Sequence, residues 1–579
     1  MCRNMRRIPG ARLAWLVALV AVGLIGPCAE GFAEMLDPKA VRAAALASGL
    51  DSLAKVPIPK IANLTEFLRP GAAAKQASVR LGKALFWDMQ AGSDGQVCGS
   101  CHFHAFADNR VKNQLNPGLR NVEPAKQNLF GLTGSGSRGG ANYKLQEADF
   151  PFHALADPEE NNHERRQILH GTDDVASSQG VFGARFQGVN PTSSFDLGEA
   201  YLDEVFGVAG VNARRVEPRN TPTIVNAVFN HSNFWDGRAH NLFNGVSVLG
   251  PLDRDARIFV NDGGALVRTE VRIPNSSLAS QAVGPPVNSE EMSFIDRPFP
   301  AVGRKFLGLR PLGRQLVHPQ DSVLGGLARG GSPGLRVGYA ELVKQAFLPR
   351  YWNSQQQVRV DGADGLYTQM EANFALFFGL AVQMYESTLI SQRTPFDRFM
   401  AGNDTALEPE QLQGLLVFIN QGKTAAGTSR NLPQVDAVIS RSGLAIGAGN
   451  CVSCHGGAAL TDAAIPSLVQ EGELELIELE ETPELAGGLL TVSRKEGLLD
   501  NGFSNIGVRP VNDDLGRGGT EKGLPLSFTR LALAGHDDLL PEGAELPCVA
   551  GRCPDKVQVN GALQGARAAQ RRADRPLFP

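Results

Sequence analysis

Two short stretches of the chain carry two cysteines and a histidine at a spacing that can attach a haem covalently. They are Cys98-Gly-Ser-Cys101-His102 and Cys451-Val-Ser-Cys454-His455. Thiols at this spacing reach the two vinyl groups of one porphyrin, and the imidazole that follows can bind the iron. The spacing therefore predicts two haem c groups, with His102 and His455 as the proximal ligands.

Zinc binding or dithiol redox chemistry is the alternative interpretation of these cysteines. Zinc sites usually draw their cysteine pairs or histidines from one compact knuckle, whereas these two pairs lie about 350 residues apart. A redox dithiol does not require a histidine after both pairs. The repeated motif therefore favours haem attachment.

The first residues predict export. Four arginines precede the apolar run from Leu13 to Gly26, which is short for a membrane span. We expect a signal peptide over residues 1–33 and a periplasmic mature chain; an uncleaved membrane anchor is the alternative. No later stretch is apolar enough to cross a bilayer, so we expect no membrane span in the mature chain.

Length and composition set further limits. The chain has 579 residues, enough for two or three domains, and its formal net charge of −4 gives no sign of nucleic-acid binding. The 65 glycines and 35 prolines indicate many loops. In an oxidising compartment, Cys548 and Cys553 are expected to form a disulfide.

Periodicity predicts where the regular elements lie. Residues 40–90, 367–391 and 408–420 show helical patterns, and residues 471–481 alternate Glu with Leu or Ile as a half-exposed strand does. The commoner role for such an acidic strand is a hairpin exposed to solvent. The alternative role is a surface that binds a basic partner. Residues 103–216 are rich in Gly, Asn, Asp and Pro and predict elaborate loops. A Gly-rich stretch over 310–336 predicts a connection between two haem domains, 34–340 and 341–579.

Several stretches resemble the bacterial dihaem cytochrome c peroxidase family, which includes MauG-type enzymes. The most specific are Arg219-Asn-Thr-Pro-Thr-Ile-Val-Asn-Ala227 and Phe234-Trp-Asp-Gly-Arg-Ala239. The others are residues 81–88 before the first motif, 374–402, 505–508 and 514–517. The resemblance runs from about Leu81 to Arg517, with long inserts.

The resemblance implies a mainly α fold with two cytochrome c-like haem domains and long loop inserts. It also implies reduction of hydrogen peroxide with electrons from a small periplasmic donor, a cytochrome c or a cupredoxin. The second haem would receive each electron, Trp235 would relay it, and the first haem would perform the chemistry. Core packing is the alternative role for Trp235.

The family places a glutamine and, ten residues later, a glutamate over the peroxide-binding face of the first haem. Directly after the Phe234 stretch the chain offers only Gly245, but the pattern recurs at Gln281 and Glu291. We therefore expect an insert over about residues 244–279 and assign Gln281 and Glu291 as the distal pair. A carboxylate there can move a proton between the peroxide oxygens. An exposed loop acid is the alternative for Glu291.

The chain also departs from the family. Classical members carry a histidine upstream that leaves the iron on activation, and the corresponding position falls near Asn212. Two alternatives to a peroxidase remain. The missing histidine favours the first, a MauG-like oxidase that acts on a partner protein or an organic substrate. The second is an electron carrier without enzyme activity. Histidines at 104, 153, 163 and 170 could supply a ligand, although surface or packing roles are commoner.

The C-terminal part departs further. After His455 there is no Met and no Tyr, the family's sixth ligands of the second haem, and only His536 could substitute. The family has a characteristic segment where residues 563–579 stand, and these residues do not resemble it. When permitted codons for residues 563–579 are read one base later, they encode a sequence that closely resembles that segment. We therefore expect a frameshift that truncates the second domain. The family also binds calcium through an asparagine matching Asn220, and the other calcium groups lie in the missing segment.

Overall fold

The computed structural model describes most of the chain. The described residues are 36–111, 115–116, 143–150, 153–157, 167–171, 174–208, 210–424, 427–486, 489–506, 511, 514–541, 544, 546–547 and 557–564. The predicted signal peptide, His163, the Cys548 and Cys553 pair, and the tail after residue 564 lie outside these ranges.

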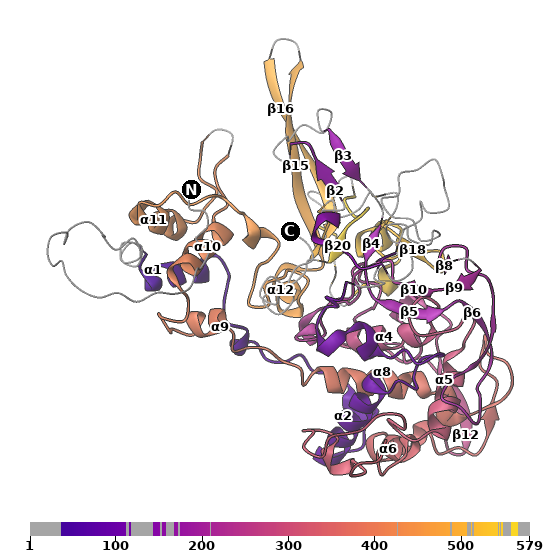
Figure 1. Ribbon diagram of the computed structural model, residues 1–579. Coiled ribbons are helices and arrows are strands. Elements are labelled where there is room, and N and C mark those ends of the chain that lie inside the picture. Colours follow the sequence, from indigo (N-terminus) through magenta and orange to yellow (C-terminus); the bar gives the residue numbers. More distant parts are fainter. Residues whose placement is uncertain are drawn as a thin grey trace, which may run out of the picture.

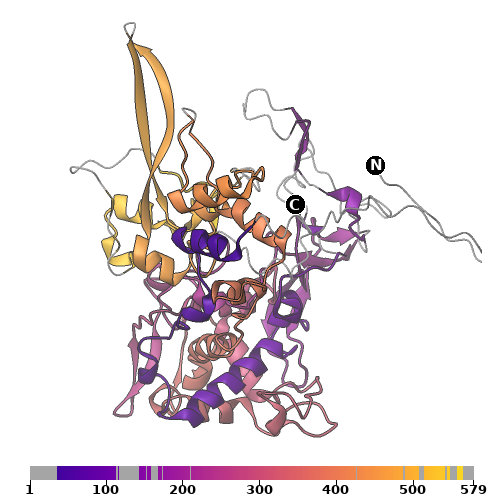
Figure 2. The same cartoon turned by 90° about the vertical axis from the view of Figure 1, so that its left-hand side faces the viewer.

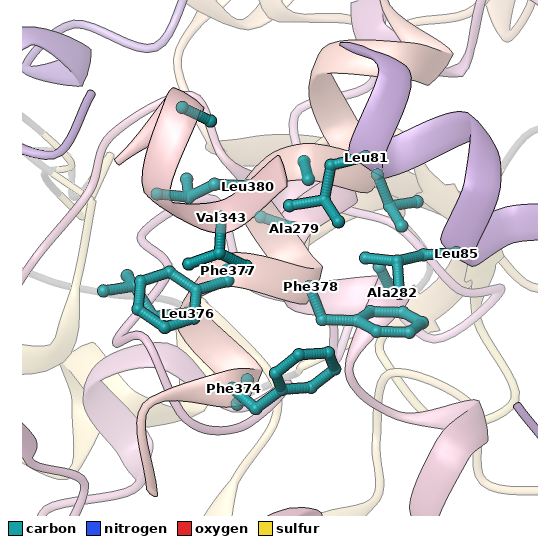
Figure 3. Packing of buried hydrophobic residues seen from close by; sticks show 14 of the residues in the cluster. Leu81, Leu85, Ala279, Ala282, Val343, Phe374, Leu376, Phe377, Phe378 and Leu380 are labelled. Atoms are coloured by element: carbon teal, nitrogen blue, oxygen red, sulfur yellow. The ribbon is translucent and has the colours of Figure 1, made fainter. Parts of the chain in front are cut away.

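The largest hydrophobic core is built by four helices (Figure 1). They are α2 (Ala72–Trp87), α5 (Phe299–Gly308), α6 (Tyr339–Ala346) and α8 (Phe374–Glu386). Every α8 residue except Met384 is buried, as expected for a helix that is apolar on all faces. Phe374, Phe377 and Phe378 project from α8 into this core (Figure 3).

A second hydrophobic core surrounds the second cysteine motif. It is built by α1 (Pro38–Ala47), α9 (Pro395–Met400), α10 (Pro409–Ile419) and α11 (Pro433–Ser442). Each of these helices begins with a proline, whose missing N–H is not needed in the first turn. Figure 1 shows α1 beside α10 and α11, although hundreds of residues separate them in sequence.

The chain therefore alternates between the two cores. Helix α1 comes first in the sequence yet packs with the later helices, and α8 follows residue 340 yet packs on α2. Residues on both sides of position 340 thus build the first core. The division into domains at that position stays a prediction.

The strands form only two-stranded antiparallel ribbons in the described part of the chain. Between residues 103 and 216, where loops are predicted, the pairs are β1 (Leu115–Asn116) with β4 (Val175–Ala176), β2 (His153–Leu155) with β3 (Ile168–Gly171), β5 (Gln179–Phe182) with β10 (Arg214–Val216), β6 (Ala184–Gly188) with β7 (Leu197–Ala200), and β8 (Gly207–Val208) with β9 (Val211–Asn212). These strands are too short to produce a periodic sequence signal.

Later ribbons and short helices complete the fold. The ribbons are β13 (Gln357–Val358) with β14 (Tyr367–Thr368), β17 (Phe503–Ser504) with β20 (Leu563–Gln564), and β18 (Thr520–Glu521) with β19 (Leu524–Pro525). The helices are α3 (Cys98–Cys101), α4 (Ser277–Ala282), α7 (Gln369–Ala372), α12 (Ile465–Glu471) and α13 (Phe528–Leu533).

The predicted insert near residues 244–279 folds as a hairpin on the first core. Strand β11 (Ile258–Asp262) pairs with β12 (Ala265–Thr269) across Gly263 and Gly264. Both glycines have positive φ angles, 58° and 100°, as a two-residue hairpin turn requires. The backbone N–H of Phe259 donates to Asn373 Oδ1 at 2.8 Å, just before α8. The insert is therefore an ordered part of the first core.

The acidic strand predicted near residues 471–481 is confirmed. Strand β15 (Leu474–Ala486) pairs with β16 (Leu489–Asp500) in a long ribbon that projects from the body of the molecule (Figure 2). Because both cores are helical and the strands form only ribbons, the fold is mainly α, as predicted. Among the described helices, none is both long and apolar enough to cross a bilayer.

The contact between α2 and α8 leaves no room at Gly82. A Cβ there would lie 1.8 Å from the Ala381 carbonyl oxygen. We predict that Gly82→Ala forces the helices apart and lowers the free energy of unfolding by about 1–3 kcal/mol, measured by thermal or urea unfolding of the holoprotein. Gly414→Ala is the control, since that exposed α10 glycine has nothing within 4 Å. Equal effects of the two changes would contradict the prediction.

Candidate functional site

The first motif is presented by a short helix at the edge of the larger core. Helix α3 carries Cys98 and Cys101, and His102 follows it. His102 Nδ1 lies 2.8 Å from the carbonyl oxygen of Pro222, so Nδ1 carries the proton and Nε2 stays available to a metal. Burial lowers the pKa of His102 to about 4, against the raising effects of this hydrogen bond and of Asp108. The imidazole is therefore neutral, as an iron ligand must be.

The thiols of this motif lie in acidic surroundings. Burial raises the pKa of Cys98, and Glu386 and Glu291 raise it further. Burial likewise raises the pKa of Cys101, with contributions from Glu217, Glu291 and Asp108. The two free thiols and the oriented imidazole fit a haem c.

The second motif repeats this arrangement. Cys451 lies in a short 3-10 helix, and both Cys451 and Cys454 are free. His455 Nδ1 lies 3.3 Å from the Leu460 carbonyl oxygen, and its ring centroid is 6.4 Å from that of Phe418 on α10. The donor set fits a second haem c, with His455 oriented by a backbone carbonyl as His102 is.

Trp235 is hydrogen-bonded to segments that lead to both motifs. Its indole N–H donates to the Asn220 carbonyl oxygen at 2.7 Å, and Pro222, two residues later, accepts from His102. Its own carbonyl accepts from the backbone N–H of Gln564 at 2.6 Å. Gln564 lies in β20, which pairs with β17. Burial raises the pKa of the Cys454 thiol, and Ser504 of β17 opposes this rise.

Arg219 ties together three of the stretches singled out in the sequence. Its Nε and Nη2 donate to the two carboxylate oxygens of Asp514 at 2.9 and 2.7 Å. Its Nη1 donates to Asp236 at 2.6 Å. Burial alone would raise the pKa of Asp236, but Arg238 and Arg219 lower it overall. Asp236 is therefore ionised, and the network holds its neighbour Trp235 in place.

The predicted distal residues occupy two adjoining segments. Gln281 lies on α4, which is fixed by a 2.8 Å hydrogen bond from Ser280 to the His240 carbonyl. Glu291 lies in the following loop and interacts electrostatically with both Cys98 and Cys101. Burial and Glu290 raise the pKa of Glu291 to about 7, although Arg238 opposes them. Glu291 is therefore a half-buried acid close to the thiols of the first motif.

Two further acids beside this motif, one buried and one half-buried, were missed by sequence reasoning. Glu386 ends α8, and burial raises its pKa to about 8. Glu217 follows β10, and burial together with Glu291 and Glu290 raises its pKa well above the ordinary value. Both adjoin stretches that resemble the family, at Arg219 and at Tyr385. That adjacency is the signal that could have identified them.

The remaining predicted positions have the following surroundings. His104 is exposed against the ring of Phe103, and His536 is half-buried at the end of α13. Asn212 donates to the carbonyls of Gly183 and Tyr201, which gives it a structural role in the loops. The Asn220 side chain donates to the Ala176 carbonyl at 3.1 Å.

Two buried histidines flank the Trp235 segment. The rings of His231 and His240 meet the edge of the Phe528 ring at centroid distances of 6.3 and 5.7 Å. Burial and the charge of Arg517 lower the pKa of His231 to about 4. Burial, His231 and Arg517 lower that of His240 to about 3. Both rings are therefore neutral packing groups at neutral pH.

Known proteins are similar to this chain in sequence. A family model described as di-haem cytochrome c peroxidase matches residues 76–405, which include the first motif, Arg219, Trp235 and Glu291. The cytochrome c551 peroxidase of Pseudomonas aeruginosa is 26% identical over 215 residues. That alignment covers 37% of this chain and 38% of the Pseudomonas protein, so well under half of this curated relative is matched.

Haem content provides a direct test of the two motifs. We predict two haems per chain, measured as the pyridine haemochrome and by the mass of the intact secreted protein. Replacing both cysteines of either motif by serine, at 98 and 101 or at 451 and 454, should remove one haem, because the thioether bonds are lost. Haem content unchanged by either double substitution, or colourless protein from a host competent in haem ligation, would contradict the assignment.

The buried histidines predict a pH dependence of stability. Between pH 6.5 and about 3, the unfolded chain protonates His240 while the folded protein does not, so stability falls as the pH is lowered through this window. His240→Asn keeps an acceptor for the Leu242 N–H, found at 2.9 Å, but does not titrate. Its stability deficit relative to the wild type should shrink by about 1.4 kcal/mol per pH unit over this window, measured by urea unfolding.

His318→Asn is the matched control for that measurement. His318 also accepts a backbone N–H two residues later, from Gln320, but its side chain is exposed. We expect no change in the deficit of this variant with pH. A parallel change in both variants would contradict burial of His240 as the cause.

Proposed function

Since the chain belongs to the di-haem cytochrome c peroxidase family, we propose that it reduces hydrogen peroxide to water with electrons from a small redox protein in the periplasm. Cytochromes c and cupredoxins are the donor classes that suit this role. The observation that carries the proposal is the half-buried, protonatable Glu291 beside the first haem-attachment motif. The overall reaction joins one peroxide, two electrons and two protons to give two waters.

Cys98, Cys101 and His102 would hold the reacting haem, and Cys451, Cys454 and His455 would hold the electron-receiving haem. When bound, haem supplies a redox-active iron that can bind peroxide and exchange electrons. The Pro222 carbonyl fixes the orientation of His102, and the Leu460 carbonyl fixes that of His455. The chain thereby determines which imidazole nitrogen faces each iron.

Trp235 is proposed as the relay between the two haems. Its hydrogen bond to Asn220 and the contact of its carbonyl with β20 support this role, because they link it to the supports of both motifs. An indole is polarisable and apolar. Calcium near Asn220 stays a prediction drawn from the family.

Glu291 is proposed to move the proton. It takes a proton from the peroxide oxygen nearer the iron and returns one to the farther oxygen, which leaves as water. A group with a pKa of about 7 can both accept and donate at neutral pH. Gln281, fixed on α4, is proposed to orient the peroxide by hydrogen bonding.

A MauG-like oxidase is the second candidate function. It is favoured by Asn212, which occupies the region of the displaceable histidine and is engaged with the Gly183 and Tyr201 carbonyls. Peroxide consumption with a reduced cytochrome or cupredoxin, compared with oxidation of a partner protein, separates the two enzymes. Two six-coordinate irons with a spectrum indifferent to peroxide would indicate an electron carrier instead.

The proton-moving role of Glu291 predicts a loss of turnover. Glu291→Gln keeps the size of the side chain but cannot take up a proton, so kcat/KM for peroxide should fall about 10²- to 10⁴-fold. The measurement is steady-state turnover with a reduced small cytochrome, at haem content equal to that of the wild type. Glu204→Gln, at an exposed position, is the control and should retain activity. Full activity of Glu291→Gln would refute the assignment.

A further inference from the structure

The ribbon of β5 and β10 brings a second carboxylate to the first motif. Gln179 of β5 lies opposite Val216 of β10, and its carbonyl accepts a hydrogen bond from the Cys101 thiol at 3.8 Å. Glu217 is the next residue after Val216, and its backbone N–H donates to the Ser178 carbonyl at 3.0 Å. The backbone of Glu217 is therefore fixed beside the cysteine that would carry the haem.

The loop that carries Glu291 is fixed against the same ribbon. Gly180 of β5 packs so closely on it that a Cβ would lie 1.7 Å from the Glu290 carbonyl oxygen and 2.7 Å from that of Glu291. Arg215 of β10 donates to the backbone and hydroxyl oxygens of Ser289 at 3.3 and 3.4 Å. Contacts from both strands thus hold the loop, and Glu217 and Glu291 interact electrostatically beside the first motif.

Glu217 has a buried acceptor atom with no partner. Its Oε1 is buried and receives no hydrogen bond. The charged and titratable groups that face Glu217 are Glu291 and Glu290 of the loop, Arg238 of the Trp235 segment, and Cys101 of the first motif. Two neighbouring carboxylates that are withdrawn from solvent cannot both ionise without a large cost in free energy. A proton therefore resides on the pair of Glu217 and Glu291.

We propose that Glu217 and Glu291 form a proton-sharing carboxyl pair beside the first motif, in which Glu217 holds a proton that peroxide reduction consumes. This inference rests on the proposed peroxidase function. When Glu291 moves a proton from one peroxide oxygen to the other, the first water leaves and the protein takes up no proton from solvent. The second water requires two further protons, which accompany the two donor electrons. Glu217 passes one of them to Glu291, and the pair regains protons from solvent.

Glu217 is therefore a positioning residue, because it acts through Glu291. A purely structural role would be visible as a change in stability alone. A proton-sharing role also changes the titration of Glu291, since the two acids then take up protons in coupled steps. The two roles are thus separable by experiment.

The test is infrared difference spectroscopy of the ferric holoprotein through a pH titration, with Glu217→Gln, Glu291→Gln and the control Glu204→Gln. In the wild type, the protonated-carboxyl signal should titrate in two coupled steps. In Glu217→Gln, one step should remain, shifted to lower pH by about one unit because the neighbouring acid is gone. Glu204→Gln should behave as the wild type.

Turnover provides the second readout. For Glu217→Gln we expect kcat to fall about tenfold with KM for peroxide unchanged, and the alkaline limb of the kcat profile to move to lower pH. Glu217→Asp, which retains a carboxyl, should recover most of kcat. An unchanged Glu291 titration, or a change confined to the melting temperature, would overturn the proposal.

The proposed peroxidase function and the proposed carboxyl pair can be refuted by different results. If the wild type does not turn over peroxide, or Glu291→Gln keeps full activity, the proposed function fails and the consuming role of Glu217 fails with it, whatever the infrared titration shows. The other case is an active wild type, an inactive Glu291→Gln variant, and a Glu217→Gln variant that titrates and turns over as the wild type does. In that case the proposed function stands and only the carboxyl pair is refuted.

Discussion

The bidentate contact between Arg219 and Asp514, shared with Asp236, is the constraint on which the site depends. One guanidinium joins three chain segments that are far apart in sequence. A lysine could not satisfy two carboxylates in this forked geometry. Pro222 and Trp235 lie close in sequence to Arg219 and Asp236. The contact therefore fixes both the carbonyl that orients His102 and the indole of Trp235.

A second ion pair extends this constraint into the C-terminal part. Arg517 Nε donates to Asp500 at 2.6 Å, and its Nη1 reaches the carbonyls of Asp236 and Gly237 at 3.3 Å. Its guanidinium also lies over the Phe503 and Phe528 rings. Removing one partner of so deeply buried a pair would leave an uncompensated charge, so the residues act as one unit. The turn after Trp235 is thus clamped by Arg219 and by Arg517.

Much of this arrangement follows from local sequence signals. The cysteine motifs, helices α8 and α10 and strand β15 were predictable, because covalent spacing and residue periodicity are local properties. The packing of α1 against α10 and α11 was not, since the contact joins residues hundreds of positions apart. Glu217 was missed for a related reason: its neighbour Glu291 is brought to it by strand pairing and by Gly180, neither of which leaves a periodic pattern.

The ribbons between residues 103 and 216 also reach the first motif. Strand β5 contacts the Cys101 thiol, and β10 leads directly into Glu217. Beside the first motif Glu386 is buried and Glu217 and Glu291 are half-buried, whereas the neutral His231 and His240 are buried near Trp235. Under the proposed function, these acids would serve proton transfer where peroxide is reduced. Arg238 acts on both Glu217 and Glu291 and pairs with Asp236, so the acids and the Trp235 turn belong to one connected network.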